Sequence, residues 1–351
     1  MVGVGFGRVA GDRGCRFRCL GAQVPSRYAR RQRRRASPSA SSPAASEPGT
    51  QSGADELSLF SPCKVNLFLR ITRKREDGFH ELASLFQTLA FGDAMRVEPL
   101  PSSATEDEIV CNDPSVPCDD SNLVIKAANL YRRKAGKRGY YRIVLNKRVP
   151  AGAGLGGGSG NAATMLWAAN ALSGSPAAES DLRDWSGDIG SDISFFFSSG
   201  SAYCTGRGEV VRAMPPALPS DAPILLLKPP QPLSTGAVYG RLDVTACSDA
   251  DPETLLASFY GGGPIDQSQC VNDLETPAFA AMPSLLSAKE ALLGEGIYDA
   301  VFMSGSGSTM VGLGSHDLGA RVRAGREDWI VERTHPISRT EDAWFEPQRT
   351  P

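Results

Sequence analysis

The sequence has few of the residues that build metal centres, and it lacks the long apolar runs that cross membranes. Only three of its 351 residues are histidine, and none of its eight cysteines stands in a C-x-x-C pair, which argues against a zinc cluster. No uncharged apolar run approaches the roughly 20 residues of a transmembrane helix. We therefore expect a soluble protein that holds no metal through its own side chains. Its cysteines would be reduced, structural thiols in a cytosol-like or stromal compartment.

Acidic residues are scarce in the first 50 residues, which contain ten arginines and only Asp12 and Glu47. Ten positive and two negative charges give this segment +8, so the rest must carry −10 to reach the net −2 of the chain. A Ser- and Ala-rich stretch follows at residues 36–46. Such a composition is typical of an organelle transit peptide, which we predict at residues 1–55. A basic arm that binds nucleic acid and a tail without a role are the alternatives, and the acidic remainder argues against the first.

Beyond this segment, predicted strands and helices alternate irregularly, which favours an α+β fold in two layers over a doubly wound parallel sheet. Strands are predicted at residues 57–60, 65–71, 94–99, 108–111, 140–145, 224–228, 300–303 and 328–334, with a hairpin at 201–214. Helices are predicted at residues 123–134, 161–172, 180–186, 235–239 and 283–293. Proline-rich residues 215–223 read as a linker. We therefore predict domains at 56–216 and 217–345, followed by a tail at 346–351.

Residues 152–160 contain six glycines between a predicted strand and a predicted helix. Glycine lets the backbone turn tightly and bring its N–H groups close to a ligand. A loop of bare N–H groups that feeds a helix N-terminus is suited to binding phosphate.

Three other interpretations of this loop fit less well. Gly152, Gly154 and Gly157 match the spacing of a dinucleotide fingerprint, but Lys147 and Pro150 separate the glycines from the strand that should directly precede them. No Gly-Lys-Ser/Thr closes the loop, so it is not a Walker P-loop. A purely structural loop does not account for its place between a strand and a strong helix. The remaining interpretation is a P-x-x-x-G-L-G loop of the kind that wraps the triphosphate of ATP in GHMP kinases.

Four ordered segments carry a wider resemblance, which runs from about Leu57 to near Trp344. They are Ser61–Leu69 with Asp77–Leu82, Pro150–Thr164, Gly190–Phe196 and Phe302–Thr309. Together they resemble the 4-diphosphocytidyl-2-C-methyl-D-erythritol kinase family of the GHMP kinase superfamily. The resemblance implies a two-domain GHMP kinase fold with the active site in the interdomain cleft. It also implies ATP-dependent phosphorylation of the substrate 2-hydroxyl in the non-mevalonate isoprenoid pathway, within the chloroplast stroma. Mg²⁺ would be carried mainly by ATP.

Two charged residues in these segments have the chemistry that phosphoryl transfer needs. Asp192 can take the proton of the acceptor hydroxyl as a general base. Lys64 can keep Asp192 ionised and stabilise the charge of the moving phosphoryl group. Outside these motifs, Asp192 would read as a turn cap and Lys64 as a solvated strand residue.

The resemblance also assigns binding roles. The ATP-binding residues it implies are Asn122, Lys147, Pro150, Gly152, Gly154, Leu155, Gly156, Gly157, Gly158, Ser159, Gly160 and Asn161. The substrate-binding residues are Asn66, Phe79, His80, Thr235, Tyr239, Gly305 and Ser306. Within this set, His80 would hydrogen-bond the cytosine, while Phe79 and Tyr239 would stack on its two faces.

Simpler interpretations remain for several of these residues. Phe79 and Tyr239 could be core aromatics, Lys147 a surface lysine and Asn122 a helix cap. The chain also departs from the family pattern, because Phe79 stands in place of tyrosine, Gly160 in place of serine and Ser194 in place of proline.

Two other functions stay open at this point. The chain could be another GHMP kinase that acts on mevalonate, homoserine or a sugar, or a catalytically silent nucleotide-binding protein of the same fold. Asp77–His80 favours a cytidine-containing substrate, and the presence of both Lys64 and Asp192 favours catalysis. We expect a small-molecule substrate, no nucleic-acid or membrane partner, and a monomer or homodimer.

Overall fold

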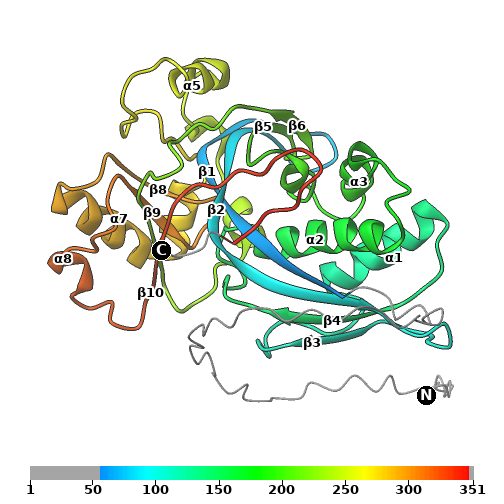
Figure 1. Ribbon diagram of the computed structural model, residues 1–351. Coiled ribbons are helices and arrows are strands. Elements are labelled where there is room, and N and C mark those ends of the chain that lie inside the picture. Colours follow the sequence, from blue (N-terminus) through cyan, green and yellow to red (C-terminus); the bar gives the residue numbers. More distant parts are fainter. Residues whose placement is uncertain (1–55, 348–351) are drawn as a thin grey trace, which may run out of the picture.

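The computed structural model describes residues 56–347, so the predicted transit segment lies outside the described residues. These residues form two β-sheets with helices packed on them (Figure 1). Two long antiparallel strands, β1 (Leu57–Lys74) and β2 (His80–Pro99), form the centre of the larger sheet. β1 pairs along the length of β2, and β2 also pairs with β4 (Tyr141–Asn146) and β5 (Ser201–Gly206). Since a strand has two edges, β4 and β5 follow one another along the edge that β1 leaves free.

Short strands complete both sheets. β3 (Glu108–Cys111) pairs with β4, and β6 (Val210–Ala213) pairs with β5 in the expected hairpin. The second sheet has the order β10-β7-β9-β8. Its strands are β7 (Ile224–Lys228), β8 (Ala300–Met303), β9 (Met310–Leu313) and β10 (Ile330–Thr334).

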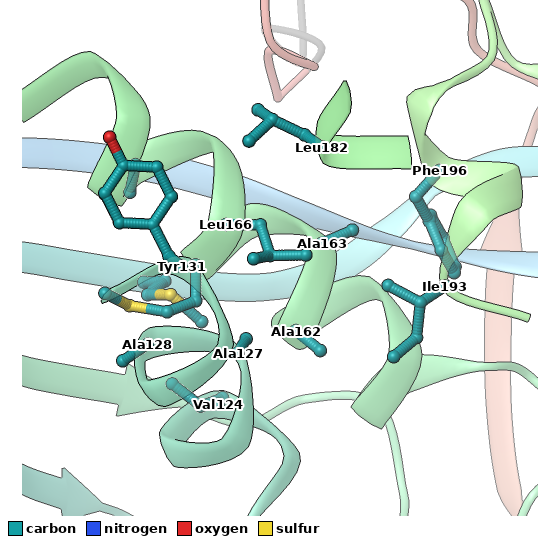
Figure 2. Packing of buried hydrophobic residues seen from close by; sticks show 14 of the residues in the cluster. Val124, Ala127, Ala128, Tyr131, Ala162, Ala163, Leu166, Leu182, Ile193 and Phe196 are labelled. Carbon is teal, nitrogen blue, oxygen red and sulfur yellow. The ribbon is translucent and has the colours of Figure 1, made fainter. Parts of the chain in front are cut away.

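Three helices cover one face of the larger sheet, namely α1 (Leu123–Ala135), α2 (Gly157–Leu172) and α3 (Glu179–Ser186) (Figure 1). Small side chains such as Ala128 and Ala163 let α1 and α2 approach closely, and Tyr131 and Leu166 fill the remaining space (Figure 2). A short 3₁₀ helix (Ser194–Phe197) adds three buried phenylalanines to this core. The buried layer holds the start of α2, and therefore the glycine-rich loop, against the sheet.

The second half of the chain carries its own helices. They are α4 (Thr235–Tyr239), α5 (Pro252–Ser258), α6 (Glu275–Ala281), α7 (Pro283–Glu295) and α8 (Ala320–Arg323), with a 3₁₀ turn at Val244–Ala246. Leu285, Ala288 and Leu292 of α7 are fully buried in a cluster that also contains residues of the second sheet. Within residues 56–347, no helix is both long and apolar enough to span a bilayer.

The last described residues return to the first half of the chain. Ile337, Trp344 and Phe345 join the core under α1 and α2, and the Trp344 indole Nε1 donates to the Phe60 carbonyl at 3.0 Å. Arg339 pairs with Glu179 of α3. The division at residues 216 and 217 stays a prediction. The segment at residues 337–345 follows the second sheet in the chain but packs on the first half, so it connects the two halves.

The structure corrects several expected elements. The strands expected at 57–60 and 65–71 are one strand, because Pro62 sits at a β-bulge and does not end the pairing. Residues 80–93 of β2 were missed, together with α5, α6, α8 and β9; this part of β2 is mostly buried on both faces, which removes the alternation that marks a strand. The helix expected from Asn161 begins at Gly157, since Gly156 takes a left-handed conformation (φ +65°) and ends the loop there.

Candidate active site

A cavity of about 1020 Å³ opens where the two halves of the chain meet. Its walls come from β1, β2, the glycine-rich loop and α2 on one side and from α4 and the 304–309 loop on the other. The predicted site residues that line it are Lys64, Asn66, Phe79, His80, Asn122, Lys147, Pro150, Gly152, Gly154, Leu155, Gly156, Gly157, Gly158, Ser159, Asn161, Asp192, Thr235, Tyr239, Gly305 and Ser306. Segments that lie far apart in the sequence therefore meet around one space.

Gly160 is the predicted site residue that does not line this cavity. A Cβ at this position would lie 2.5 Å from the Pro62 carbonyl oxygen and 3.3 Å from the Phe196 ring. The missing side chain therefore lets α2 pack closely against β1. A serine here would point at that packed strand, so Gly160 does not leave a gap in the wall of the cavity.

The glycine-rich loop presents backbone groups to the cavity. Gly152, Gly154 and Gly156 all have positive φ angles (+62°, +74° and +65°), which L-residues with a Cβ rarely adopt. No side chain caps α2, and the first N–H groups of a helix have no partner within it. The positive end of the helix dipole and these free donors make a site for anionic oxygens.

A second glycine-rich loop, Ser304–Thr309, packs against the first and donates hydrogen bonds to it. The Ser304 hydroxyl donates to the Gly154 carbonyl at 2.9 Å, and the Thr309 N–H donates to the Ala153 carbonyl at 3.2 Å. A Cβ on Gly154 would lie 2.2 Å from the Ser304 carbonyl oxygen. Asn272 in turn donates to the carbonyls of Met303 and Gly305 at 2.7 and 2.8 Å. The contact of the two loops thus depends on the absence of a side chain at Gly154.

A buried carboxylate anchors the start of the glycine-rich loop. Asp93 on β2 is 1% exposed and pairs with Lys147. It also accepts from the backbone N–H groups of residues 148 and 149 at 2.7 and 2.9 Å and from the Asn161 amide at 2.9 Å. Lys147 also donates to Asn161 Oδ1 at 3.0 Å. Lys147 therefore lines the cavity while its ammonium group already contacts Asp93 and Asn161. Asp93 connects the start of the loop to the first turns of α2.

The predicted catalytic pair forms in the structure. Lys64 Nζ lies 3.3 Å from Asp192 Oδ2, with side-chain exposures of 4% and 33%. The stem of Lys64 packs on Gly156, where a Cβ would lie 2.9 Å from Lys64 Cγ. Lys64 Nζ also donates to Asn66 Oδ1 at 2.7 Å and lies 4.5 Å from the centre of the Phe86 ring. The ammonium group is thus held between the glycine-rich loop and Asp192.

A serine that the sequence analysis missed orients this pair. Ser84 on β2 is fully buried, accepts from Asn66 Nδ2 at 2.8 Å and donates to the Phe68 carbonyl at 2.5 Å. The β1–β2 register shifts between Asn66 and Phe68, which is a β-bulge. Bulges next to active sites re-aim side chains, and Ser84 satisfies the carbonyl group that this one exposes. Ser84 therefore fixes the Asn66 amide with its oxygen toward Lys64.

Aromatic side chains gather at the opposite end of the cavity. The rings of His80 and Tyr239 lie 5.3 Å apart between centroids, and Phe79 is 55% exposed. Burial, and then the charge of Lys74, lowers the pKa of His80, so its imidazole is neutral at neutral pH. Burial, followed by the charge of Asp192, raises the pKa of Tyr239. The Thr235 and Ser306 hydroxyls lie 2.9 Å apart at the edge of this region.

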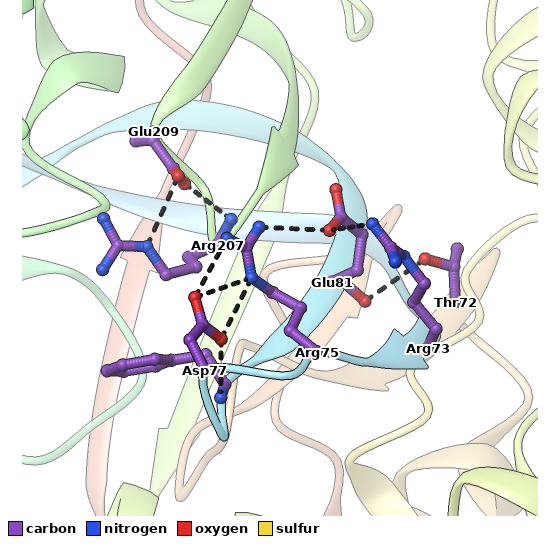
Figure 3. A network of polar contacts seen from close by, with 8 residues as sticks. Thr72, Arg73, Arg75, Asp77, Glu81, Arg207 and Glu209 are labelled. Atoms are coloured by element: carbon purple, nitrogen blue, oxygen red, sulfur yellow. Dashed lines mark hydrogen bonds and ion pairs between the residues drawn. The ribbon is translucent and has the colours of Figure 1, made fainter.

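Charged residues hold the turn that carries Phe79 (Figure 3). Asp77 accepts from the Phe79 N–H at 3.1 Å and pairs with Arg75 at 3.0 Å. Arg207, in the β5–β6 turn, places its guanidinium carbon 5.3 Å from the centre of the Phe79 ring. Arg207 itself contacts Glu209. The Phe79 ring is thus exposed, while hydrogen bonds and ion pairs hold the turn that carries it.

Asn122 is the N-cap of α1. Its Oδ1 accepts from the Val124 N–H at 2.8 Å, and its Nδ2 donates to the Pro117 carbonyl at 2.6 Å. These contacts favour the capping interpretation, although the residue also lines the cavity.

Four residues that position the site escaped the sequence analysis: Ser84, Asp93, Asn272 and Arg207. Asp93 could have been noticed as a carboxylate within an apolar stretch, Phe91–Met95, because a buried charge needs partners. Ser84 and Asn272 carry no comparable local signal, since their partners are far away in the sequence. Arg207 was recognised only as part of a hairpin turn.

Comparison with known proteins adds independent information. Residues 122–200 match the family described as GHMP kinases N terminal domain. The chain is 52% identical over 305 residues to the protein named 4-diphosphocytidyl-2-C-methyl-D-erythritol kinase, chloroplastic, of Mentha piperita, covering 86% of this chain and 75% of that protein.

Solved structures show the same fold. A crystal structure of 4-(cytidine 5'-diphospho)-2C-methyl-D-erythritol kinase aligns with a TM-score of 0.65 at 32% identity, over 80% of this chain and all (100%) of that one. A homoserine kinase from Cytophaga hutchinsonii aligns with a TM-score of 0.61 over 83% of this chain and 98% of that chain; at 17% identity it supports the fold alone. The α+β GHMP kinase fold expected from the sequence is confirmed.

Proposed function

The chain belongs to the 4-diphosphocytidyl-2-C-methyl-D-erythritol kinase family, and from this premise we propose how its cavity carries out the reaction. The protein is an ATP-dependent kinase that phosphorylates the 2-hydroxyl of 4-diphosphocytidyl-2-C-methyl-D-erythritol in the non-mevalonate isoprenoid pathway. Its plant relatives are named chloroplastic, and like them it is a chloroplast enzyme. The family and the activity predicted from the four motifs are therefore confirmed, while the roles of individual residues below are proposals.

The ion pair of Lys64 and Asp192 carries the proposed mechanism. It lies between the phosphate-binding end of the cavity and the aromatic end, where a phosphoryl donor and an acceptor alcohol would meet. Asp192 accepts the proton of the 2-hydroxyl as that oxygen attacks the γ-phosphorus of ATP. Lys64 holds the Asp192 carboxylate through their 3.3 Å ion pair and stabilises the charge that spreads over the transferred oxygens.

The glycine-rich loop and the start of α2 bind the ATP phosphates in this proposal. Their free N–H groups would hold the β- and γ-phosphoryl oxygens without any side chain in between. The described residues include no group of three or more His, Cys, Asp or Glu side chains that could hold a metal. Mg²⁺ would enter with ATP and keep most of its ligands from the phosphates and water, and Ser159 and Asp192, which line the cavity, would offer it oxygen ligands. Bound there, Mg²⁺ would neutralise phosphate charge.

Phe79, His80 and Tyr239 bind the cytosine in this proposal. A neutral imidazole offers one donor and one acceptor, which suits the mixed hydrogen-bonding edge of cytosine. Mevalonate, homoserine and simple sugars have no aromatic base for such a site. The aromatic end of the cavity therefore favours a cytidine-containing acceptor over the other substrates of this fold.

A direct test uses the full-length chain with ATP, Mg²⁺ and four acceptors: the cytidylyl substrate, mevalonate, homoserine and galactose. ADP release should follow only the first. The Asp192→Asn variant should keep its affinity for ATP and lose kcat by about 1,000-fold, since a general base contributes about 10²–10⁴-fold.

Two results would contradict the proposal. Turnover of mevalonate, homoserine or galactose without turnover of the cytidylyl compound would reject the substrate. Near-normal kcat in Asp192→Asn would reject Asp192 as the base while leaving the activity of the family intact.

A further inference from the structure

Arg207 is a cation at the wall of the cavity that the mechanism above does not use. Four cationic side chains line the cavity within residues 56–347, namely Lys64, Lys74, Lys147 and Arg207. Lys64 pairs with Asp192, and Lys147 pairs with buried Asp93. The backbone N–H of Arg207 donates to Glu209 at 2.6 Å, and the one hydrogen bond of its guanidinium is a long one of 3.4 Å from Nε to Glu209. Its two terminal nitrogens, Nη1 and Nη2, have no hydrogen-bond partner in the described part of the chain.

The turn that carries Arg207 lies beside two parts of the proposed acceptor site. On one side the guanidinium lies 5.3 Å from the centre of the Phe79 ring, in the region assigned to the cytosine. On the other side, a Cβ on the next residue, Gly208, would lie 3.0 Å from Asp192 Oδ1. Figure 3 shows Arg207 and Glu209 beside the Asp77 turn that holds Phe79. The Arg207–Gly208 turn therefore contacts both the proposed base site and the proposed catalytic carboxylate.

The substrate must place its diphosphate in this interval. Its cytosine is at one end and its reactive 2-hydroxyl at the other, so the two linking phosphates cross the space between Phe79 and Asp192. Resting on the proposed function, we propose that Arg207 is a specificity-determining residue that binds this diphosphate through Nη1 and Nη2.

The chemistry of arginine suits this position. A guanidinium can lie flat on an aromatic ring and still donate in its own plane to two phosphate oxygens. It would also offset the two negative charges of the linkage, close to Asp192 and to the ATP phosphates. Lys74 is the cavity cation for which the described residues show no ion pair, but it lies next to His80, on the side of the base.

One nucleotide, CDP, and its nucleoside, cytidine, distinguish a phosphate contact from a role of Arg207 in supporting Phe79. Binding of CDP and of cytidine is measured by calorimetry on the full-length chain, with a non-hydrolysable ATP analogue saturating the phosphate end. In Arg207→Gln, the Kd of CDP should rise about 10- to 100-fold, as expected for charge-assisted hydrogen bonds. The Kd of cytidine, which has no phosphate, should stay unchanged. Arg207→Lys, which keeps the charge and loses the planar fork, should fall between the two.

A matched control lies on the same hairpin. Arg212 on β6 also stacks on an aromatic ring, with its guanidinium carbon 4.7 Å from the centre of Tyr203, and pairs with Glu253 at 2.9 Å. It does not line the cavity. Arg212→Gln should bind both CDP and cytidine with the Kd of the wild type.

The outcomes separate the two proposals. Equal weakening of CDP and cytidine in Arg207→Gln would show that Arg207 acts through Phe79 alone, and unchanged CDP binding would show that it makes no phosphate contact. Either result overturns the assignment of Arg207 and leaves the proposed function standing. A wild-type protein that binds neither CDP nor cytidine would instead overturn the proposed substrate site.

Discussion

The two ends of the cavity are built from different parts of the chain. At the end proposed to bind ATP, Pro150–Ser159 is one continuous segment in which five of the ten residues are glycines that leave the backbone exposed. At the acceptor end, Asn66, Phe79, His80, Asp192 and Tyr239 come from β1, β2, α4 and the connections between elements. A phosphate needs only N–H donors and a dipole, which any short glycine-rich segment can supply. An alcohol, a base and a proton acceptor need different side chains at fixed distances.

This difference predicts which kind of substitution impairs each end of the cavity. The ATP end should fail when a side chain is added to the backbone. The acceptor end should fail when a side-chain contact is removed.

Apart from the catalytic pair itself, Gly154→Ala should have the largest effect. The new Cβ would lie 2.2 Å from the Ser304 carbonyl oxygen, and alanine would have to adopt a φ of +74°. The two glycine loops would have to separate, and a shift of about 1 Å in a catalytic site costs on the order of 100-fold. We expect kcat/KM for ATP to fall by about 100-fold, measured by steady-state kinetics beside a thermal melt.

Gly263→Ala serves as the control, because a Cβ there would meet no atom within 4 Å and Gly263 does not line the cavity. Its melting temperature should equal that of the wild type. If Gly154→Ala kept the kcat/KM of the wild type, the contact between the loops would not matter for ATP binding.

Ser84→Ala should have an intermediate effect at the acceptor end. Without the Ser84 hydroxyl, the Asn66 amide loses the contact that keeps its oxygen toward Lys64. We expect kcat to fall about tenfold, which corresponds to about 1.4 kcal/mol, with KM for ATP unchanged.

Ser201→Ala serves as the control, since Ser201 is also buried on the larger sheet and does not line the cavity. Its kcat should match that of the wild type. A rise in KM for ATP without a decrease in kcat would show that Ser84 affects ATP binding and not the acceptor end.

The smallest expected effect is the pH dependence of substrate binding. Burial lowers the pKa of His80, so protonation of the imidazole requires a pH below the ordinary value of about 6.5. KM for the cytidylyl substrate should stay constant from about pH 8 down to about pH 6.5 and rise a few-fold only at lower pH, where the acceptor nitrogen is lost. His80→Gln should remove this acid limb. A rise in KM that already begins above about pH 7 would contradict a lowered pKa.

Local patterns predicted most elements of the structure. The helix at 123–134 and the strands at 108–111, 224–228 and 300–303 match α1, β3, β7 and β8 closely, because turns bound each of them clearly. β2 was predicted only at residues 94–99. Its first half is covered on both faces and shows no alternation, so only tertiary contact reveals it as a strand. α5 and α6 were missed because they are short helices of seven residues each.

The candidate site shows the same division. Gly152, Gly154 and Gly156 were predicted as a phosphate-binding segment, because a run of glycines leaves the backbone N–H groups of a loop open to a ligand. Gly160 belongs to that run by sequence, yet it packs against Pro62 and lies outside the cavity wall. Composition cannot distinguish a glycine that faces a ligand from one that faces a neighbouring strand.

The sequence by itself determined the motifs, the family and the chemical groups available for catalysis, because these depend on residue type and local order. The tertiary structure decided which groups meet. It brought Lys64 within 3.3 Å of Asp192, placed Ser84 against Asn66, and set the Arg207–Gly208 turn against both Phe79 and Asp192. Hydrogen bonds and ion pairs act over only a few ångströms. The pairing of β1 with β2, and of β2 with β4 and β5, creates those short distances between residues that the sequence keeps far apart.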